Sequence, residues 1–429
     1  MRKILHITVH LGGGAGKAIT GLAMVGDTIV LLESPQKIYW VERAVQKGIQ
    51  VIIAPETEEL VRLIQEFDVT VINWWGHPLM IQFMASFPEI PCRLLLYSHI
   101  NGCAYPYLPF SFLDIFDAVM FTTPYSYENP FWTDVERKEI CKRSDVVYGM
   151  GDFDPRAYLP RKSYQKKDDF CVGYIGTLNY AKLHPEFVKY CEAAAAKVKN
   201  IRFMLAGDME DDVRLDIQRS RIAERFVYVG YTNETEAFYK EIDVLGYLLN
   251  RNNFATTENV LLEAMAYATP VVALNHGVER HIIEDGKNGY LADHAEAYAE
   301  RIYQLYLSEN KRKELGETAR QICIEKYAKD KNKKAYEQIL RKYLDQPKRI
   351  HGISVLSEKT PYEWFLYFSF ADRHSLDKAV GARFVQQSKG SVFQYARCFP
   401  QDVNLQRACD GKSEGKQTCR PYIKGGGRK

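Results

Sequence analysis

The chain has 429 residues, 46% of them hydrophobic, so it can bury the cores of two or three domains of ordinary size. Its 57 lysines and arginines nearly balance 54 aspartates and glutamates, and a formal charge of +3 argues against a nucleic-acid partner. Nine cysteines without a CxxC pair indicate reduced thiols, and no run reaches the ~18 apolar residues of a membrane span. We expect a cytoplasmic protein that contacts a membrane at most peripherally, at its inner face.

Short apolar runs alternate with amphipathic stretches from the first residue onwards. The stretch KAITGLAMV indicates a helix, and the apolar runs indicate strands at ILHITV, TIVLLE, VIIAP, VTVINWW and RLLLYSHI. This alternation is typical of βαβ units and of a parallel sheet with helices on both faces. The sequence therefore predicts a Rossmann-like domain over residues 1–150.

A glycine-rich turn, HLGGGAGKA, follows the first strand at residues 10–18. It does not match a Walker A loop, because Ala18 stands where a hydroxyl residue is needed, and it lacks the third glycine of the dinucleotide fingerprint. The backbone N–H groups of Gly13 and Gly14 could still approach an anion at the start of a helix. A tight turn without a ligand is the alternative.

Two strands of this domain end in polar or aromatic residues. His99 follows the run RLLLYS, and ligands of doubly wound sheets bind beyond the carboxyl ends of the strands. A hydrogen-bonded histidine without a ligand is the alternative there. Trp74, Trp75 and His77 end another strand, where stacking on a sugar and packing in the core explain the aromatic pair equally well.

The same alternation of apolar runs and amphipathic stretches begins again at Phe170, after a segment rich in glycine, proline and charged residues. We predict a linker over residues 151–168 and a second Rossmann-like domain over residues 169–345. Its strand-end loops should share one crevice, and Lys182 is the cation there that could reach a phosphate. The other candidates in these loops are Gly176, Thr177, Gly207 and Tyr231.

The stretch TTENVLLEAMA predicts a helix capped by Thr256 or Thr257. The N–H groups at the start of such a helix, including that of Asn259, favour a phosphate group. Glu258 and Glu263 would then accept hydrogen bonds from sugar hydroxyls. An acid in the first helical turn is also favourable without a ligand, whereas Glu263 has apolar neighbours in the sequence and needs a partner.

These segments resemble the retaining GT-B nucleotide-sugar glycosyltransferases of the glycosyltransferase family four type, which contain a "glycosyl transferases group 1" domain. The resemblance extends from about Lys3 to Tyr327 and is carried by VVYGMGDFDPRAYLP, the GTL loop with Lys182, LLEAMAYATPVVAL and HGVERHIIEDGKNGYLA. It implies an α/β GT-B fold, with two Rossmann-like doubly wound domains facing across a cleft and C-terminal helices packing back. The first domain would bind the acceptor and the second the nucleotide sugar.

The resemblance further implies a metal-independent hexosyltransferase without a cofactor. It would move a sugar from a UDP- or GDP-sugar to a glycan, lipid-linked or small-molecule acceptor, with the anomeric configuration retained. His99, Lys182 and Glu258 would be the catalytic residues. Lys182 and Glu258 would also bind the donor, together with Gly13, Gly14, Gly176, Thr177, Gly207, Tyr231, Thr257, Asn259 and Glu263. The Asp-x-Asp at Asp152 lies in the linker, so we expect no metal there.

Two positions depart from the family pattern. The first of the family's two glutamates falls on Ala255, and its phosphate-binding arginine falls on Thr177, whereas the matching lysine is present as Lys182. A catalytically degenerate GT-B protein that binds a nucleotide sugar or a partner is therefore the alternative function. A Rossmann oxidoreductase is a third, weaker interpretation.

The C-terminal part contains one clear helix signal. Thr360, Pro361 and Glu363 form a capping pattern ahead of the aromatic run YEWFLYFSF, which we expect to pack on the first domain. We predict a helical return segment over residues 346–384. Residues 385–429 show no firm periodicity and are basic at their end, so we expect a loosely ordered tail.

Overall fold

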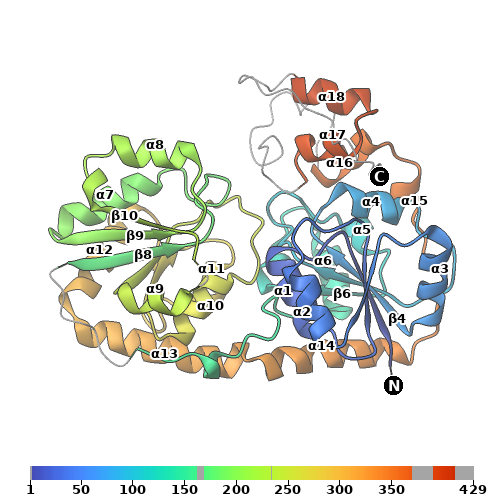
Figure 1. Ribbon diagram of the computed structural model, residues 1–429, viewed down its shortest axis with the longest axis horizontal. Coiled ribbons are helices and arrows are strands. Elements are labelled where there is room, and N and C mark those ends of the chain that lie inside the picture. The colour runs from blue at the N-terminus through green and yellow to red at the C-terminus, as the bar shows by residue number, and fades with distance from the viewer. Residues whose placement is uncertain (1, 162–168, 233, 370–389, 411–429) are drawn as a thin grey trace, which may run out of the picture. The chain divides into compact units, whose positions relative to one another are not determined.

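The computed structural model describes residues 2–161, 169–232, 234–369 and 390–410, and the chain folds into two units (Figure 1). The first unit comprises Met1–Asp152, Phe254–Thr256 and Lys333–Lys429, and the second comprises Phe153–Asn253 and Thr257–Asn332. No helix of the described residues is long and apolar enough to cross a membrane.

The first unit contains a parallel sheet with the strand order β3-β2-β1-β4-β5-β6-β7. Its strands are β1 Ile4–Thr8, β2 Thr28–Leu31, β3 Gln50–Ile53, β4 Val69–Trp74, β5 Leu94–Ser98, β6 Ala118–Phe121 and β7 Ser144–Val146. The helices that follow these strands are α1 Gly13–Leu22, α2 Tyr39–Gln46, α3 Thr57–Glu66, α4 Pro78–Ala85, α5 Phe110–Leu113, η1 Pro124–Glu128 and α6 Asp134–Lys142.

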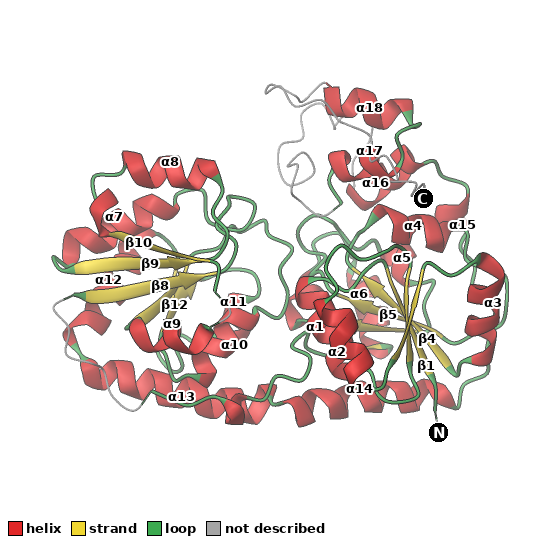
Figure 2. Cartoon of the chain, viewed as in Figure 1, coloured by secondary structure: helices red, strands yellow, loops and turns green. Residues whose placement is uncertain are grey.

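Both faces of this sheet are buried, which explains why its central strands are continuously apolar. Leu94 and Leu96 contribute to one hydrophobic cluster, whereas Leu95 and Tyr97 contribute to another on the opposite face. Side chains alternate between the faces of a strand, so helices on both sides are needed to cover them. Figure 2 shows helices flanking the strands of the sheet in this way.

The helix α14 Lys329–Leu344 packs on the first unit from Lys333 onwards. Tyr336 and Leu340 are buried in the same cluster as Tyr97, and the Tyr336 hydroxyl lies 3.3 Å from Nε2 of His6. The sequence placed residues up to 345 in the second domain, but the structure groups residues 333–344 with the first. The apolar residues of α14 decide this, because the first sheet offers the face that buries them.

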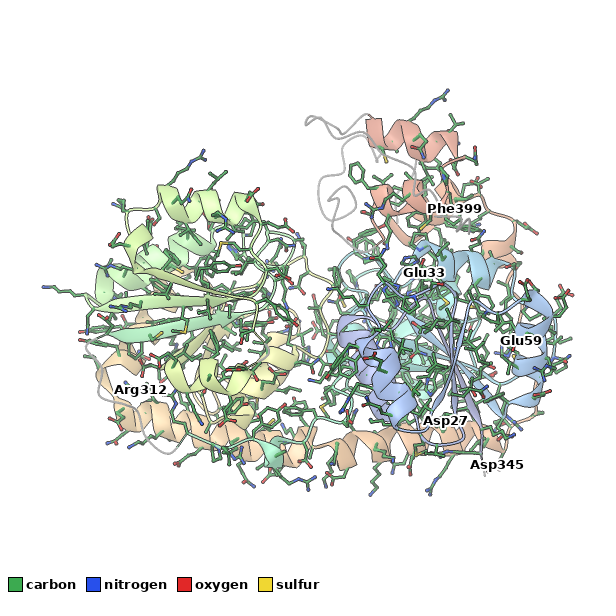
Figure 3. The ribbon with its side chains drawn as sticks, in the orientation of Figure 1. Asp27, Glu33, Glu59, Arg312, Asp345 and Phe399 are labelled. Atoms are coloured by element: carbon green, nitrogen blue, oxygen red, sulfur yellow. The ribbon has the colours of Figure 1, made fainter. Side chains whose placement is uncertain are left out.

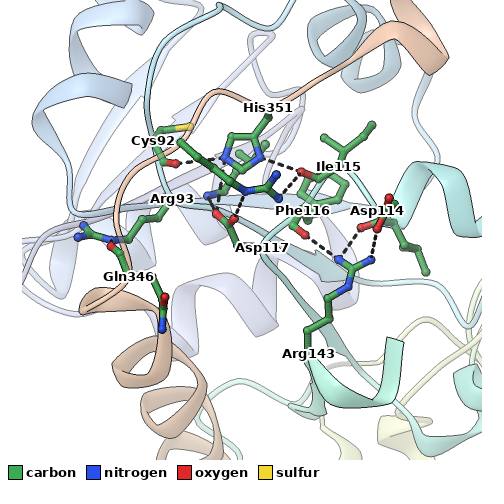
Figure 4. A network of polar contacts seen from close by, with 12 residues as sticks. Cys92, Arg93, Asp114, Ile115, Phe116, Asp117, Arg143, Gln346 and His351 are labelled. Atoms are coloured by element: carbon green, nitrogen blue, oxygen red, sulfur yellow. Dashed lines mark hydrogen bonds and ion pairs between the residues drawn. The ribbon is translucent and has the colours of Figure 1, made fainter. Parts of the chain in front are cut away.

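Polar contacts of Arg349 and His351 hold the segment after α14 against the rest of the first unit (Figure 4). The Arg349 guanidinium pairs with Asp117, with Nε 2.6 Å from Oδ1. The His351 ring lies between two backbone carbonyls, with Nδ1 2.8 Å from the oxygen of Ile115 and Nε2 3.1 Å from that of Cys92. These contacts fix the start of the return segment.

The described residues of the first unit form four further helices: α15 Ser354–Ser357, α16 Pro361–Ser369, α17 Val392–Cys398 and α18 Val403–Asp410. The predicted capping pattern starts α16, since the Thr360 N–H donates to Glu363 and the Glu363 N–H donates to the Thr360 hydroxyl. Phe365 and Phe368 are buried in the cluster that contains Trp74. The expected packing of the aromatic helix on the first domain is thus confirmed.

The expectation of a loosely ordered segment from residue 385 onwards is wrong for residues 390–410. This part forms α17 and α18, whose Val392, Tyr395, Leu405 and Cys409 are buried in the same cluster as α16. Both helices have eight residues or fewer, so their apolar periodicity is too short to detect in the sequence. Residues 385–389 and 411–429 lie outside the described residues.

The second unit contains a parallel sheet with the order β10-β9-β8-β11-β12-β13. Its strands are β8 Phe170–Ile175, β9 Ile201–Ala206, β10 Phe226–Gly230, β11 Val244–Tyr247, β12 Val271–Leu274 and β13 Tyr290–Ala292. Its helices are η2 Pro155–Ala157, α7 Phe187–Lys197, α8 Asp211–Arg219, η3 Ala223–Arg225, α9 Thr235–Glu241, α10 Asn259–Ala266, α11 Glu279–Ile282, α12 Ala295–Leu307 and α13 Glu309–Tyr327. Both units are thus doubly wound, as predicted.

Candidate functional site

The strand order of the second sheet reverses between β8 and β11, which are hydrogen-bonded neighbours. In a doubly wound sheet, the loops beyond such a switch point open a crevice at the carboxyl edge. The loop after β8 carries Lys182, and the last residue of β11 is Tyr247. The candidate site is therefore built at the position where the topology favours ligand binding.

Two glycine turns at this edge approach each other too closely for side chains. Gly207 follows β9 with φ +129°, and a Cβ added to it would lie 1.9 Å from the carbonyl oxygen of Gly176. Its N–H donates to the carbonyl of Gly230 at 2.8 Å, which joins the ends of neighbouring strands. Tyr231, the next residue, is exposed. The sequence candidates Gly176, Gly207 and Tyr231 thus share one edge.

The loop after β8 holds Lys182 at the site. Oδ1 of Asn179 accepts a hydrogen bond from the Lys182 N–H at 3.1 Å, which fixes the turn locally. Nζ of Lys182 lies 4.0 Å from Oε2 of Glu258 and 5.9 Å from the centre of the Tyr247 ring. Thr177 is exposed, and its carbonyl accepts from the Tyr174 hydroxyl at 3.2 Å. Lys182 remains partly open to solvent, so its cation is accessible to an anion.

The helix α10 does not start as the sequence predicted. It begins at Asn259, and Glu258 rather than Thr256 or Thr257 is the N-cap, with φ 46° and ψ 65°. A non-glycine residue in this left-handed region is held at a cost of about 1–3 kcal/mol by its surroundings. Thr257 is buried next to it. Neither threonine therefore occupies the N-cap position, and the Glu258 side chain at that position is buried.

The Glu258 carboxylate is buried against Tyr247. The Tyr247 hydroxyl donates a hydrogen bond to Oε2, whereas Oε1 has no hydrogen-bond partner among the described residues. Burial and then the charge of Glu258 raise the pKa of Tyr247 well above its usual range. Tyr247 therefore stays protonated and donates to the carboxylate, while Oε1 is left to accept a hydrogen bond from another group.

The sequence pattern did not indicate Tyr247, nor two residues beside this pair, Glu279 and His276. Glu279, the first residue of α11, is buried, and its Oε2 lies 3.8 Å from Nδ1 of His276. Burial, followed by the charge of Glu258, raises the pKa of Glu279 well above its usual range. Glu279 lies in the segment that resembles the family, but no local pattern there distinguishes a buried acid from an exposed one.

Glu263 has different neighbours from Glu258. Its charge contributes, after burial, to raising the pKa of Tyr158, Tyr239 and Tyr267. Glu258 instead contacts Tyr247 and Lys182, so the two acids have separate sets of neighbours. The structure thus brings Lys182 and Glu258 together, and it supplies Glu263 with the polar neighbours that its apolar sequence context required.

The candidates of the first unit lie at the carboxyl edge of the first sheet. Nε2 of His99 is 3.2 Å from Oδ1 of Asn73, and its ring contacts that of Tyr97 edge-on, with centroids 4.4 Å apart. A Cβ added to Gly13 or Gly14 at the start of α1 would meet nothing within 4 Å. There is therefore room above these backbone groups, although the histidine already has protein partners.

Aromatic and charged groups gather where the first sheet reverses its strand order, between β1 and β4. His10 lies 3.1 Å from Glu33, and its ring contacts those of Trp75 and His77, with centroids 4.9 and 6.0 Å apart. Glu33, labelled in Figure 3, follows β2. Trp74 is fully buried, so core packing rather than sugar stacking explains its place in the sequence.

The linker acids have partners within their own units. Oδ2 of Asp152 lies 2.7 Å from Nζ of Lys47 in the first unit, and Oδ1 of Asp154 lies 2.7 Å from Nε of Arg156 in the second. No group of three or more histidine, cysteine, aspartate or glutamate side chains in the described part of the chain is arranged to hold a metal ion.

The family model described as glycosyl transferases group 1 matches residues 157–322. This segment is a glycosyl transferases group 1 domain. It contains Lys182, Tyr247, Glu258 and Glu279, so all four residues of the site just described belong to the domain.

Curated relatives of this chain include proteins named as glycosyltransferases. The capsular polysaccharide biosynthesis glycosyltransferase CapM of Staphylococcus aureus is 23% identical over 166 residues, which are 38% of this chain and 43% of CapM. The N-acetyl-alpha-D-glucosaminyl L-malate synthase of Bacillus anthracis is 23% identical over 216 residues, or 48% of this chain and 56% of the synthase. This chain thus spans about half the length of the curated relatives it matches.

Solved structures confirm the predicted GT-B fold with its two Rossmann-like units. Anabaena Alr3699/HepE in complex with UDP and glucose superposes with a TM-score of 0.64 at 17% identity, covering 80% of this chain and 100% of HepE. The lipopolysaccharide outer core galactosyltransferase WaaB superposes with a TM-score of 0.59 at 12% identity, covering 80% of this chain and 99% of WaaB. The glycosyl transferases group 1 domain therefore belongs to a GT-B chain.

Proposed function

We propose that this chain is a retaining, metal-independent hexosyltransferase that uses a UDP- or GDP-sugar. The observation that carries the proposal is the Lys182–Glu258 pair at the switch point of the glycosyl transferases group 1 domain, with Nζ 4.0 Å from Oε2. The cation can offset the negative charge of a departing diphosphate, and the carboxylate can accept hydrogen bonds from sugar hydroxyls. The complex of HepE with UDP and glucose supports a nucleotide-sugar donor for this fold.

In the proposed reaction, the bond between the anomeric carbon and the diphosphate oxygen breaks, and the acceptor oxygen bonds to the same face of that carbon. The acceptor proton passes to an oxygen of the departing diphosphate. Lys182 offsets the charge that develops on the diphosphate. The Glu258 carboxylate accepts a hydrogen bond from a hydroxyl of the transferred sugar. No metal or further cofactor is needed for these steps.

The remaining predicted residues take supporting roles in this proposal. His99 orients the sugar or the acceptor. The donor contacts backbone or side-chain groups of Gly13, Gly14, Gly176, Thr177, Gly207, Tyr231, Thr257, Asn259 and Glu263.

The acceptor is proposed from the chemistry of the relatives. The names of CapM and of the malate synthase point to capsular polysaccharide and L-malate, and that of LpsE, a relative from Rhizobium meliloti, points to lipopolysaccharide core. We therefore assign a glycan, lipid-linked or small-molecule acceptor to the first unit and the nucleotide sugar to the second. A lipid-linked acceptor would require peripheral contact with the inner face of a membrane, whereas the other acceptors suit a wholly cytoplasmic enzyme.

Calorimetric titration of the full chain with UDP, GDP, ADP, dTDP and NAD, with and without EDTA, tests the donor. We expect one of UDP and GDP to bind selectively, with an affinity that EDTA does not change. Selective binding of NAD, or binding that EDTA abolishes, contradicts the proposal. Nuclear magnetic resonance of the product with the selected sugar donor then tests retention, since an inverted anomeric centre would refute it.

A second function is favoured by Ala255 and Thr177, which replace the glutamate and arginine that the family resemblance predicts there. A degenerate protein would bind a nucleotide sugar or a partner without transferring the sugar. Slow hydrolysis of the nucleotide sugar in the absence of acceptor separates the two functions. Hydrolysis that Lys182→Ala abolishes supports the enzyme, whereas tight binding with no turnover supports the binding protein.

A further inference from the structure

Two carboxyl groups of the second unit are buried, and each has one oxygen without a hydrogen-bond partner among the described residues. Glu258 caps α10, and Glu279 starts α11. Their side chains are 3% and 1% exposed, and the oxygen concerned is Oε1 in each. A buried carboxylate without a partner is costly, so the charge state of this pair has to be explained.

The charged and titratable groups that face Glu279 come from four elements. They are Glu258, Lys182 from the loop after β8, Tyr247 from β11 and His276 from the loop after β12. Burial and then the charge of Arg251 lower the pKa of His276 to about 4, so this ring is neutral at physiological pH. Among the described residues, Lys182 is thus the cation whose charge acts on Glu279.

One cation cannot balance two carboxylates in a dry site, so one of the carboxyls retains a proton. The Tyr247 hydroxyl donates to Glu258, and Lys182 lies 4.0 Å from the same oxygen, Oε2. The Glu258 carboxylate thus has a hydrogen-bond donor and a cation beside it, whereas Glu279 has the neutral His276 ring beside it. The pKa of Glu279 is raised by burial and by this neighbouring charge, so the proton belongs on Glu279.

We infer that Glu279 is a positioning residue that acts as a neutral carboxylic acid and supports the Glu258 carboxylate beside Lys182. Glu258 and Lys182 then carry charges that cancel, so the site does not repel an incoming diphosphate. An ionised Glu279 would add a negative charge and weaken the attraction for a nucleoside diphosphate. This inference rests on the proposed donor site and adds a residue to it.

Two substitutions of Glu279 separate a neutral acid from a carboxylate. Glu279→Gln keeps the size, the neutral charge and a hydrogen-bond donor, whereas Glu279→Ala removes the donor. For the full chain titrated with UDP and GDP, we expect Glu279→Gln to bind within about twofold of the wild type and Glu279→Ala to bind about tenfold more weakly, since the cavity left by the truncated side chain no longer supports Glu258 beside Lys182. Glu284→Gln is the matched control, because Glu284 is exposed and pairs with Lys287 at 2.7 Å.

The inference is overturned if Glu279→Gln loses as much affinity as Glu279→Ala, since a negative charge would then be required, or if neither variant changes the affinity. Infrared spectroscopy tests the proton without any ligand. We expect the carbonyl stretch of a protonated carboxylic acid at neutral pH in the wild type and its loss in Glu279→Gln. If the wild type bound no nucleotide, the proposed function would fail, and the presence or absence of this band would still decide the state of Glu279. Circular dichroism confirms that each variant is folded.

Discussion

Tyr247 donates a hydrogen bond through its hydroxyl to the carboxylate of Glu258, and both side chains are buried. Tyr247 ends β11, and Glu258 stands eleven residues later as the cap of α10. This contact links a strand end to a helix start and holds Glu258 in a left-handed backbone conformation. It fixes the carboxylate at the distance from Lys182 on which the proposed donor site depends.

Removing the hydroxyl in Tyr247→Phe should therefore lower stability and donor affinity together. The ring and its stacking on Tyr174 remain, but the buried carboxylate loses a donor, which costs about 1–3 kcal/mol. Urea denaturation measures the change. Tyr174→Phe is the control, because the Tyr174 hydroxyl donates to the uncharged carbonyl of Thr177 and should matter less. An unchanged unfolding free energy of Tyr247→Phe would refute the role of the contact.

Replacing Lys182 by alanine should weaken binding of the nucleoside diphosphate by tenfold or more, since a charge-assisted contact to phosphate contributes about 1.5–3 kcal/mol. Lys189→Ala, which removes an exposed lysine paired with Glu186, should leave the affinity unchanged. Titration calorimetry with the preferred nucleotide makes the comparison. Equal losses in both variants would indicate a general effect of charge rather than a contact at the site.

Glu263→Ala should also weaken nucleotide-sugar binding, whereas Asp152→Ala should not. Asp152 pairs with Lys47 in the first unit, whereas Lys182 and Glu258 belong to the second. The same titrations, with a divalent cation and with EDTA, measure both variants. Equal effects from Glu263→Ala, Lys182→Ala and Asp152→Ala would contradict the assignment of the site.

Gly207→Ala should destabilise the second unit, because the new Cβ would overlap the carbonyl of Gly176 and the backbone has a φ of +129°. We expect a loss of about 2 kcal/mol or more, which lowers the midpoint of urea unfolding. Gly14→Ala is the matched control, since nothing lies within 4 Å of the added Cβ there. Were both variants equally stable, the close approach of the two turns would be wrong.

Stability should depend on the ionisation of His6. Burial lowers the pKa of this histidine in the folded protein from 6.5, and Asp27 offsets only part of the shift. The unfolded chain then binds a proton that the folded chain rejects, so this contribution is fully present above about pH 6.5 and decreases as the pH falls. His6→Gln should remove a slope of up to about 1.4 kcal/mol per pH unit in the unfolding free energy. Parallel pH profiles for both proteins would rule this out.

Features that depend on neighbours along the chain could be predicted from the sequence. Apolar runs at βαβ spacing predicted both doubly wound sheets, because strand and helix periodicities are local properties. The capping pattern at Thr360 predicted the start of α16 for the same reason. Lys182 was found as a cation after a strand, since the carboxyl ends of parallel strands meet at one edge.

Other features were decided only by tertiary structure. Glu258, and not Thr256 or Thr257, is the N-cap of α10, because the hydroxyl of Tyr247 at the end of β11 binds the Glu258 carboxylate. Glu279 was overlooked because its burial depends on groups far away in the sequence. Residues 333–344 and 390–410 joined the first unit because their few apolar side chains are buried only against that core. In each case a contact distant in sequence outweighed the local preference, and no local pattern records such a contact.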